Sequence, residues 1–177
     1  VHPQNPILTS ADEPELTLQK AGHADLVKTE TGDWYMVHLC GRPLTTRGRC
    51  PLGRETAIQK LTWEEDDWPY LADGGNKPKV KVSAPNLPEH KWEPPPIRND
   101  FDSPELDIHF QTLRIPLGEE MMSLTERPGY LRLKGRESLN SRHSQSLVAR
   151  RQQSFNYSAT TCLEFKPKTF QQMAGLV

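Results

Sequence analysis

The chain has 177 residues, with 22 Lys and Arg, 23 Asp and Glu, and a formal net charge of −1. Nucleic-acid-binding domains are typically strongly basic, and a membrane-spanning helix needs a run of about 18 apolar residues, so the sequence indicates neither class. Hydrophobic residues make up only 34% of the chain, and 16 prolines and 11 glycines are spread along it. This composition favours short strands joined by turns over long helices. We therefore expect an all-β protein.

The first half of the chain contains two successive hairpin patterns. Residues 23–29 and 34–40 are rich in strand formers and flank a short turn that contains Gly32. Residues 55–63 and 68–71 flank an acidic turn in the same way. Part of the third run also has helix propensity, but it is too short to hold a helix alone. Two antiparallel units in succession suggest either propeller blades or a sandwich.

The composition changes after Asp73. Seven of the sixteen prolines lie between Pro78 and Pro104, which is typical of an extended connector. Short strands are predicted beyond it, as the beginning of a second antiparallel domain, at residues 111–115, 130–134, 145–150, 160–165 and 173–177. Because the last apolar run has no turn or polar tail after it, we interpret the chain as a piece of a longer protein.

Cysteine use is sparse. The three cysteines, Cys40, Cys50 and Cys162, are an odd number at irregular spacing. This pattern gives no disulfide framework and favours a reducing compartment, so a cytoplasmic location is expected. Two alternatives have weak support: a Cys40–Cys50 disulfide, and a zinc site in which both cysteines join His23 and His38 without a CxxC pair.

Seven segments, in the same order along the chain, together resemble the β-xylosidases of glycoside hydrolase family 43. They are KAGHADLV (20–27), GDWYMVHL (32–39), CPLGRETAIQK (50–60), DFDS (100–103), QTLRIP (111–116), SLTERPG (123–129) and FQQMAGL (170–176). The resemblance implies a two-domain parent with a five-bladed catalytic β-propeller and a lectin-like β-sandwich. Residues 1–82 would then be the last part of the propeller, residues 83–100 a linker, and residues 101–177 the first strands of the sandwich.

The family resemblance also implies an activity. Such enzymes hydrolyse xylo-oligosaccharides or α-L-arabinofuranosides with inversion, using a pair of carboxyl groups as acid and base. Both groups are expected upstream of this segment, so no residue here is assigned a catalytic role. A non-catalytic carbohydrate-binding β-module is the alternative. The parent is expected to be a homo-oligomer that binds neither nucleic acid nor membrane.

Two residues match substrate-binding positions of that family. Arg54 corresponds to an arginine that reaches the sugar subsite, where its planar fork of donors suits paired hydroxyls. His23 corresponds to a histidine at the propeller centre. Strand alternation places Glu55 on the face opposite to Arg54, which indicates a structural role. No cofactor is required by the resemblance; a divalent cation such as calcium in the parent stays open, with His23 at most as a ligand.

Overall fold

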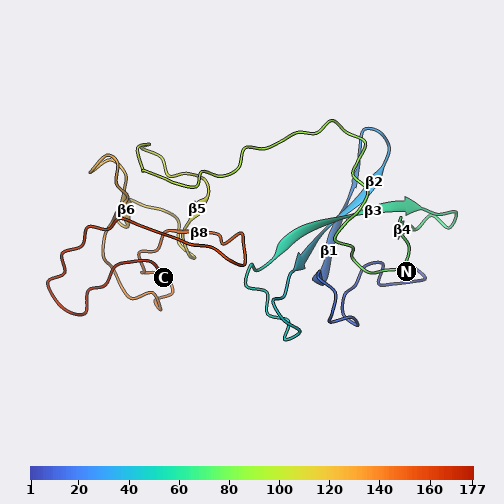
Figure 1. The fold of residues 1–177 in the computed structure, drawn as a ribbon, viewed down its shortest axis with the longest axis horizontal. Coiled ribbons are helices and arrows are strands. Elements are labelled where there is room, and N and C mark those ends of the chain that lie inside the picture. The colour runs from blue at the N-terminus through green and yellow to red at the C-terminus, as the bar shows by residue number, and fades with distance from the viewer. The chain divides into compact units, whose positions relative to one another are not determined.

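Strands are the only regular secondary structure in the computed structural model of the chain, which describes residues 1–177 (Figure 1). The chain divides into two units, Val1–Lys91 and Trp92–Val177. No helix is present that has the length and apolar character needed to cross a membrane. The predicted all-β class is therefore confirmed.

The first unit holds one antiparallel sheet in which each strand pairs with the next strand of the chain. The tight turn between the first two strands is possible because Gly32 adopts φ +92°, a conformation that favours glycine. Both predicted hairpins are confirmed, and residues 57–61 form strand rather than helix. The four strands are β1 (Gln19–Lys28), β2 (Trp34–Gly41), β3 (Glu55–Trp63) and β4 (Pro69–Leu71).

Strand β1 is irregular, whereas β2 and β3 pair without interruption. From Gln19 to Gly22, and again from Gly22 to Asp25, β1 advances by three residues while β2 advances by only two. Each interval therefore contains a β-bulge. Lys20 and His23, one in each bulge, adopt positive φ angles of 57° and 51°. These bulges bend the strand at one end of the sheet.

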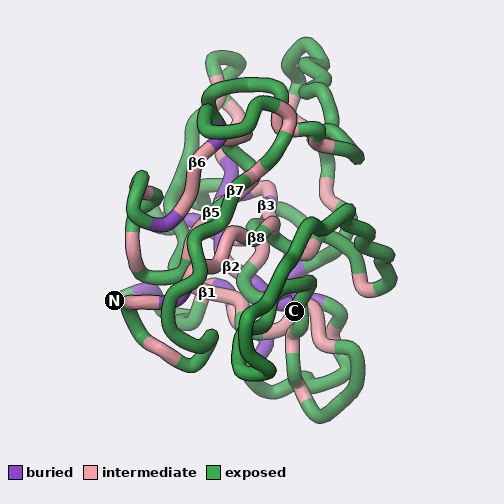
Figure 2. Tube along the Cα trace, turned by 90° about the vertical axis from the view of Figure 1, so that its left-hand side faces the viewer, coloured by how far each residue is buried: buried purple, intermediate pink, exposed green.

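The core of the first unit lies on one side of this sheet. Leu8, Met36, Leu61 and Leu71 form a buried hydrophobic cluster, in which the first residue comes from the segment that precedes β1. Figure 2 shows that buried residues (purple) occur only in short stretches. The sheet is thus covered by the N-terminal segment rather than by a helix.

Residues 77–83, which we call the strap, also lie against the sheet. The side-chain amide of Gln59 donates to the carbonyl of Lys79 (3.0 Å) and accepts from its backbone N–H (3.1 Å). The hydroxyl of Tyr35 donates to the carbonyl of Ser83 (3.1 Å). Gln59 and Tyr35 are both buried. Part of the proline-rich stretch is therefore bound to the strands that precede it.

The second unit has much less regular structure. It contains two small antiparallel pairs, β5 with β8 and β6 with β7. Met121 and Leu124 are buried beside them, as is Gln145, whose side chain donates to the carbonyl of Leu113 (3.0 Å). The strands are β5 (Phe110–Gln111), β6 (Met122–Ser123), β7 (Arg132–Leu133) and β8 (Ala149–Arg150).

Several strand predictions for the second unit were wrong. The runs predicted at 130–134 and 145–150 each contribute only two strand residues, the run at 111–115 contributes only Gln111, and the runs at 160–165 and 173–177 form no strand. Every residue from 156 to 177 is exposed, and the tube near the C-terminus in Figure 2 is green. A strand needs hydrogen bonds to a neighbouring strand, and no segment of this chain supplies them there.

Candidate functional site

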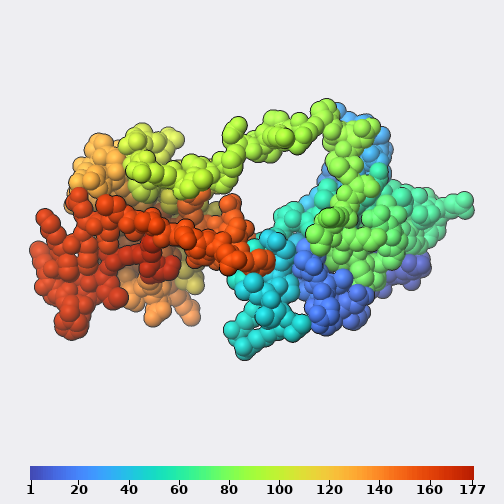
Figure 3. Space-filling model, viewed as in Figure 1, coloured from blue at the N-terminus to red at the C-terminus, as the bar shows by residue number.

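The loop between β2 and β3 joins the two strands at the bulged end of the sheet. It is closed by local backbone hydrogen bonds, including those from Leu44 N–H to the Arg49 carbonyl (3.3 Å) and from Gly53 N–H to the Cys50 carbonyl (3.0 Å). Leu52 is buried. In Figure 3 the loop (cyan) stands out from the body of the first unit. The loop is therefore anchored at its base and projects at its tip.

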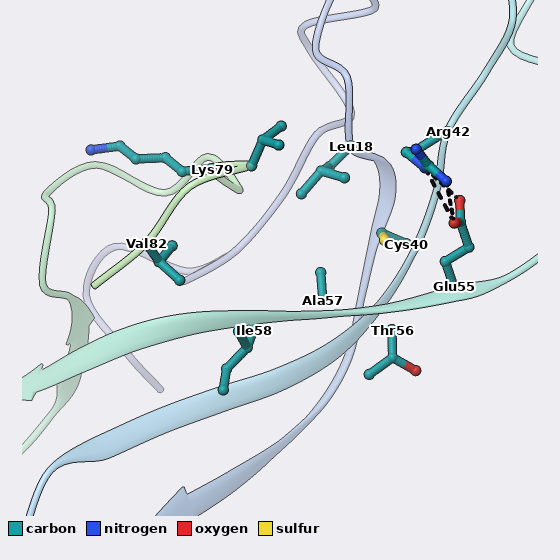
Figure 4. A pocket seen from close by; sticks show the side chains of 10 residues that line it. Leu18, Cys40, Arg42, Glu55, Thr56, Ala57, Ile58, Lys79 and Val82 are labelled. Atoms are coloured by element: carbon teal, nitrogen blue, oxygen red, sulfur yellow. Dashed lines mark hydrogen bonds and ion pairs between the residues drawn. The ribbon is translucent and has the colours of Figure 1, made fainter. Parts of the chain in front are cut away.

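An ion pair joins the two strands at the base of this loop. Arg42 donates three hydrogen bonds of 2.8 to 3.2 Å to the carboxylate of Glu55 (Figure 4). Hydrogen bonding to Glu55 raises the pKa of the Arg42 guanidinium. Both side chains are partly exposed, at 38% and 26%. Because two guanidinium nitrogens are used, the pair fixes orientation as well as distance.

A cavity of about 240 Å³ lies beside this pair. Cys40 and Ala57 project into it from β2 and β3, and Leu18 and Val82 lie across from them (Figure 4). Burial of Cys40, with a smaller contribution from the charge of Glu55, raises the pKa of its thiol. The wall nearest to the ion pair is thus polar and the opposite wall apolar.

Arg54 is exposed and immediately precedes β3. Since side chains alternate along a strand, Arg54 is expected to share the side of Thr56 and Ile58, which Figure 4 shows pointing away from Ala57. Glu55 points to the cavity side, where Arg42 binds it. The prediction that Arg54 and Glu55 face opposite sides of the sheet stays a prediction, because Arg54 lies just outside β3.

His23 is exposed on β1, within the second bulge. Its φ of 51° is uncommon for a residue other than glycine, although histidine adopts it more often than most. A bulge re-aims a side chain, and both bulges and unusual φ angles are frequent at functional sites. The local geometry of His23 is therefore of the kind found at binding positions.

The sheet brings Arg54 and His23 to the same end. Leu39 of β2 pairs with Gly22 on one side and with Thr56 on the other, which puts these three residues in one row across the sheet. His23 lies one residue from this row, toward Asp25, and Arg54 lies two residues from it in the opposite direction along the sheet. Two strand spacings, about 10 Å, separate β1 from β3 across the sheet, and the offsets along the strands add to this distance.

Neither the zinc site nor the Cys40–Cys50 disulfide considered from the sequence is formed. No group of three or more His, Cys, Asp or Glu side chains is arranged to hold a metal ion in residues 1–177. His38 is buried, with Gln59 Nε2 3.4 Å from its Nε2. Cys40 and Cys50 are free thiols. A Cβ placed on Gly41 would lie 2.9 Å from Cys50 Sγ, so Cys50 packs on the face of β2 opposite to Cys40.

Arg42 was not predicted from the sequence to be part of this site. The missing information was the register, because β2 and β3 end with the pair Cys40–Glu55, which leaves Arg42 just beyond it. An Arg immediately after the last strand residue of one hairpin arm, opposite a Glu at the start of the other, is the signal that could have identified it.

Two family models match the chain. Residues 1–69 match glycosyl hydrolases family 43, and residues 98–177 match the β-xylosidase C-terminal concanavalin A-like domain. Both describe parts of glycoside hydrolases. The chain belongs to glycoside hydrolase family 43, as the sequence motifs indicated.

Similar proteins match over nearly the whole chain. A β-xylosidase of Bacillus subtilis (strain 168) is 52% identical over 100% of this chain and 34% of its own length. A xylosidase/arabinosidase of Humicola insolens is 46% identical over 99% of this chain and 32% of its own. The crystal structure of xylan β-1,4-xylosidase from Bacillus halodurans C-125 superposes with a TM-score of 0.83 at 59% identity, over 86% of this chain and 29% of that one. The chain thus spans about a third of the length of these relatives.

Proposed function

We propose that the chain is part of a β-xylosidase of the inverting type, which hydrolyses O-glycosidic bonds in xylo-oligosaccharides or arabinosides, and that it supplies sugar-binding groups rather than the acid and base. The placement of Arg54 and His23 at one end of the same sheet carries this proposal. The names of the relatives, which act as xylosidases or arabinosidases, support it. The carboxyl pair of the inverting reaction would come from upstream of these residues.

Arg54 is suited to bind the sugar. Its guanidinium keeps its charge at every working pH and can donate two parallel hydrogen bonds to neighbouring hydroxyls. Lying immediately before β3, it is attached to a rigid strand on one side and to a loop on the other. His23 would contact the same sugar from the second bulge of β1.

The remaining features of the parent are also proposals. The sheet β1–β4 would be one blade of a five-bladed propeller, residues 83–100 the linker, and residues 101–177 the start of the sandwich. Three free cysteines support a reducing, cytoplasmic location, and the parent would assemble as a homo-oligomer. The residues of this chain do not fit a calcium site, because His23 offers one nitrogen where calcium takes six to eight oxygen ligands.

A chimera tests the proposal. The matching third of the Bacillus subtilis β-xylosidase is replaced by residues 1–177, and hydrolysis of a chromogenic β-xyloside is measured. We expect turnover by the chimera and none by the 177-residue chain alone. Arg54→Ala should lower kcat/KM of the chimera about 10- to 100-fold, the range for losing a hydrogen bond to a charged group. Arg47→Ala, in the same loop, is the matched control.

Two outcomes would contradict the proposal. Unchanged kcat/KM in the Arg54→Ala chimera would remove Arg54 from the sugar site. A folded chimera without turnover, combined with quenching of the tryptophan fluorescence of the 177-residue chain by xylo-oligosaccharides, would favour a non-catalytic carbohydrate-binding module instead.

A further inference from the structure

We propose that the Arg42–Glu55 ion pair is a positioning clamp that sets the direction of Arg54. This inference rests on the proposed function of Arg54 as a sugar-binding residue and adds two residues to that site. Neither Arg42 nor Glu55 is assigned contact with the sugar. Both act through the backbone that they hold.

The clamp lies where the ladder of backbone hydrogen bonds between β2 and β3 ends. The last register pair between β2 and β3 is Cys40–Glu55, so Arg54 is the first residue beyond the ladder. Arg42 reaches back from the other side of the loop and donates to Glu55 from Nε (3.0 and 3.2 Å) and Nη2 (2.8 Å). The side-chain pair therefore continues the link between the two strands past the point where backbone pairing stops.

Gly53, which precedes Arg54, does little to fix the direction of the Arg54 side chain. Gly53 adopts φ +74°, a conformation open to glycine at little cost, and it has no side chain to pack. The backbone of Arg54 is therefore held more firmly on its C-terminal side, where Arg42 binds Glu55, than on its N-terminal side. Because Arg54 is covalently bonded to Glu55 at the start of β3, a fixed Glu55 also limits where the backbone of Arg54 can lie.

The clamp contributes orientation more than folding stability. Its two side chains are 38% and 26% exposed, and ion pairs at such exposure add little to stability. Its use of two guanidinium nitrogens is nevertheless more restrictive than a point contact between charges. Loss of the clamp should consequently affect the reaction more than the melting temperature.

A double-mutant cycle in the active full-length enzyme or chimera tests this inference. Kinetics are measured for the unsubstituted enzyme, Glu55→Gln, Arg54→Ala and the double variant. We expect Glu55→Gln to lower kcat/KM about tenfold, since small misplacements of binding groups carry costs of this order. In the Arg54→Ala background it should have almost no further effect, because the residue that the clamp positions is gone.

Charge reversal and a control ion pair separate positioning from structure. Arg42→Glu combined with Glu55→Arg restores an attractive pair and should recover most of the lost kcat/KM. Asp33→Asn removes the ion pair of Lys60 (2.9 Å) at the other end of β3 and should leave kcat/KM unchanged.

Three results would overturn the inference. Additive effects of Glu55→Gln and Arg54→Ala would show that Glu55 does not act through Arg54. An unchanged kcat/KM for Glu55→Gln, beside a strong loss for Arg54→Ala, would reject the clamp and keep the sugar-binding assignment. Absence of hydrolysis by the folded unsubstituted enzyme would reject the proposed function, and the clamp with it.

Discussion

The side-chain amide of Gln59 pairs with the backbone of Lys79 through one donated and one accepted hydrogen bond, as the backbones of two neighbouring strands do. Its amide nitrogen donates to the Lys79 carbonyl (3.0 Å) and its amide oxygen accepts from the Lys79 N–H (3.1 Å). Gln59 is 3% exposed, so these bonds form largely out of water. They hold the strap against the sheet and close one side of the cavity next to Cys40.

Replacing Gln59 by leucine should release the strap. The substitution keeps the volume but removes both hydrogen bonds, and we expect the free energy of unfolding to fall by about 1–3 kcal/mol. Amide exchange at Lys79 should become faster at the same time. Lys79→Ala is the matched control, since it keeps the backbone groups and should cost less than about 0.5 kcal/mol. Equal unfolding curves for Gln59→Leu and the unsubstituted chain would show that the strap is held by other contacts.

Gly41 allows the loop base to pack closely. An added Cβ would lie 2.9 Å from Cys50 Sγ and 3.2 Å from its Cβ, closer than side chains normally pack. Gly41→Ala should therefore destabilise the chain by about 1–3 kcal/mol. Cys50→Ala in the same chain should recover part of this loss, because it removes the sulfur. Gly135→Ala is the control, since its Cβ would meet no atom within 4 Å; similar costs at both glycines would contradict the packing argument.

Cys40 and Cys162 should differ in reactivity toward alkylating reagents. Cys40 is 2% exposed and burial raises the pKa of its thiol, while Cys162 is exposed. Because the thiolate is the reactive form, iodoacetamide at pH 8 should modify Cys162 rapidly and Cys40 slowly. Mass spectrometry of peptides from timed samples measures both rates, and urea-unfolded chain gives the reference in which the difference disappears. Equal rates in the folded chain would mean that the environment of Cys40 is open.

Arg127 should control the titration of Glu164. Two hydrogen bonds of 2.6 and 2.8 Å from its guanidinium lower the pKa of the Glu164 carboxyl. A folded-state pKa below the unfolded value of about 4.3 gives stabilisation that is present above that value and is lost as the pH falls through the folded pKa. Carboxyl carbon shifts across the acid range measure this pKa.

The variant Arg127→Gln should move the Glu164 midpoint upward toward the ordinary glutamate value. Arg136→Gln, which removes an arginine of the same unit, should leave the curve in place. If both variants gave the curve of the unsubstituted chain, the pair would not persist in solution.

The first sheet could be predicted from sequence because the residues that define each of its hairpins lie close together in the chain. The turn at Gly32 and the strand formers on either side of it define a hairpin within a few residues. The bulges of β1 left no such trace, since Lys20 and His23 take positive φ angles that neither residue type predicts. Of the site, the start of a strand at Glu55 was predictable, whereas the partner of Glu55 depended on the register.

The second unit shows the opposite case. Residues 160–165 have strand-forming composition, yet no strand forms there. The composition of a segment shows that it can form a strand when a neighbouring strand is available. Whether a neighbouring strand lies beside it depends on the tertiary structure. Leu163 and Phe165 accordingly stay 51% and 41% exposed.

The two bulges of β1 have a consequence for how this strand can change in length. A bulge accommodates one extra residue without altering which face the following side chains occupy. Loss of one residue from either bulge would therefore leave the pairing of Asp25 to Lys28 with β2 intact. A deletion beyond Asp25 would instead turn every later side chain to the other face. Insertions and deletions among related chains should accordingly be tolerated near Lys20 and Ala24 and excluded from the regular part of the strand.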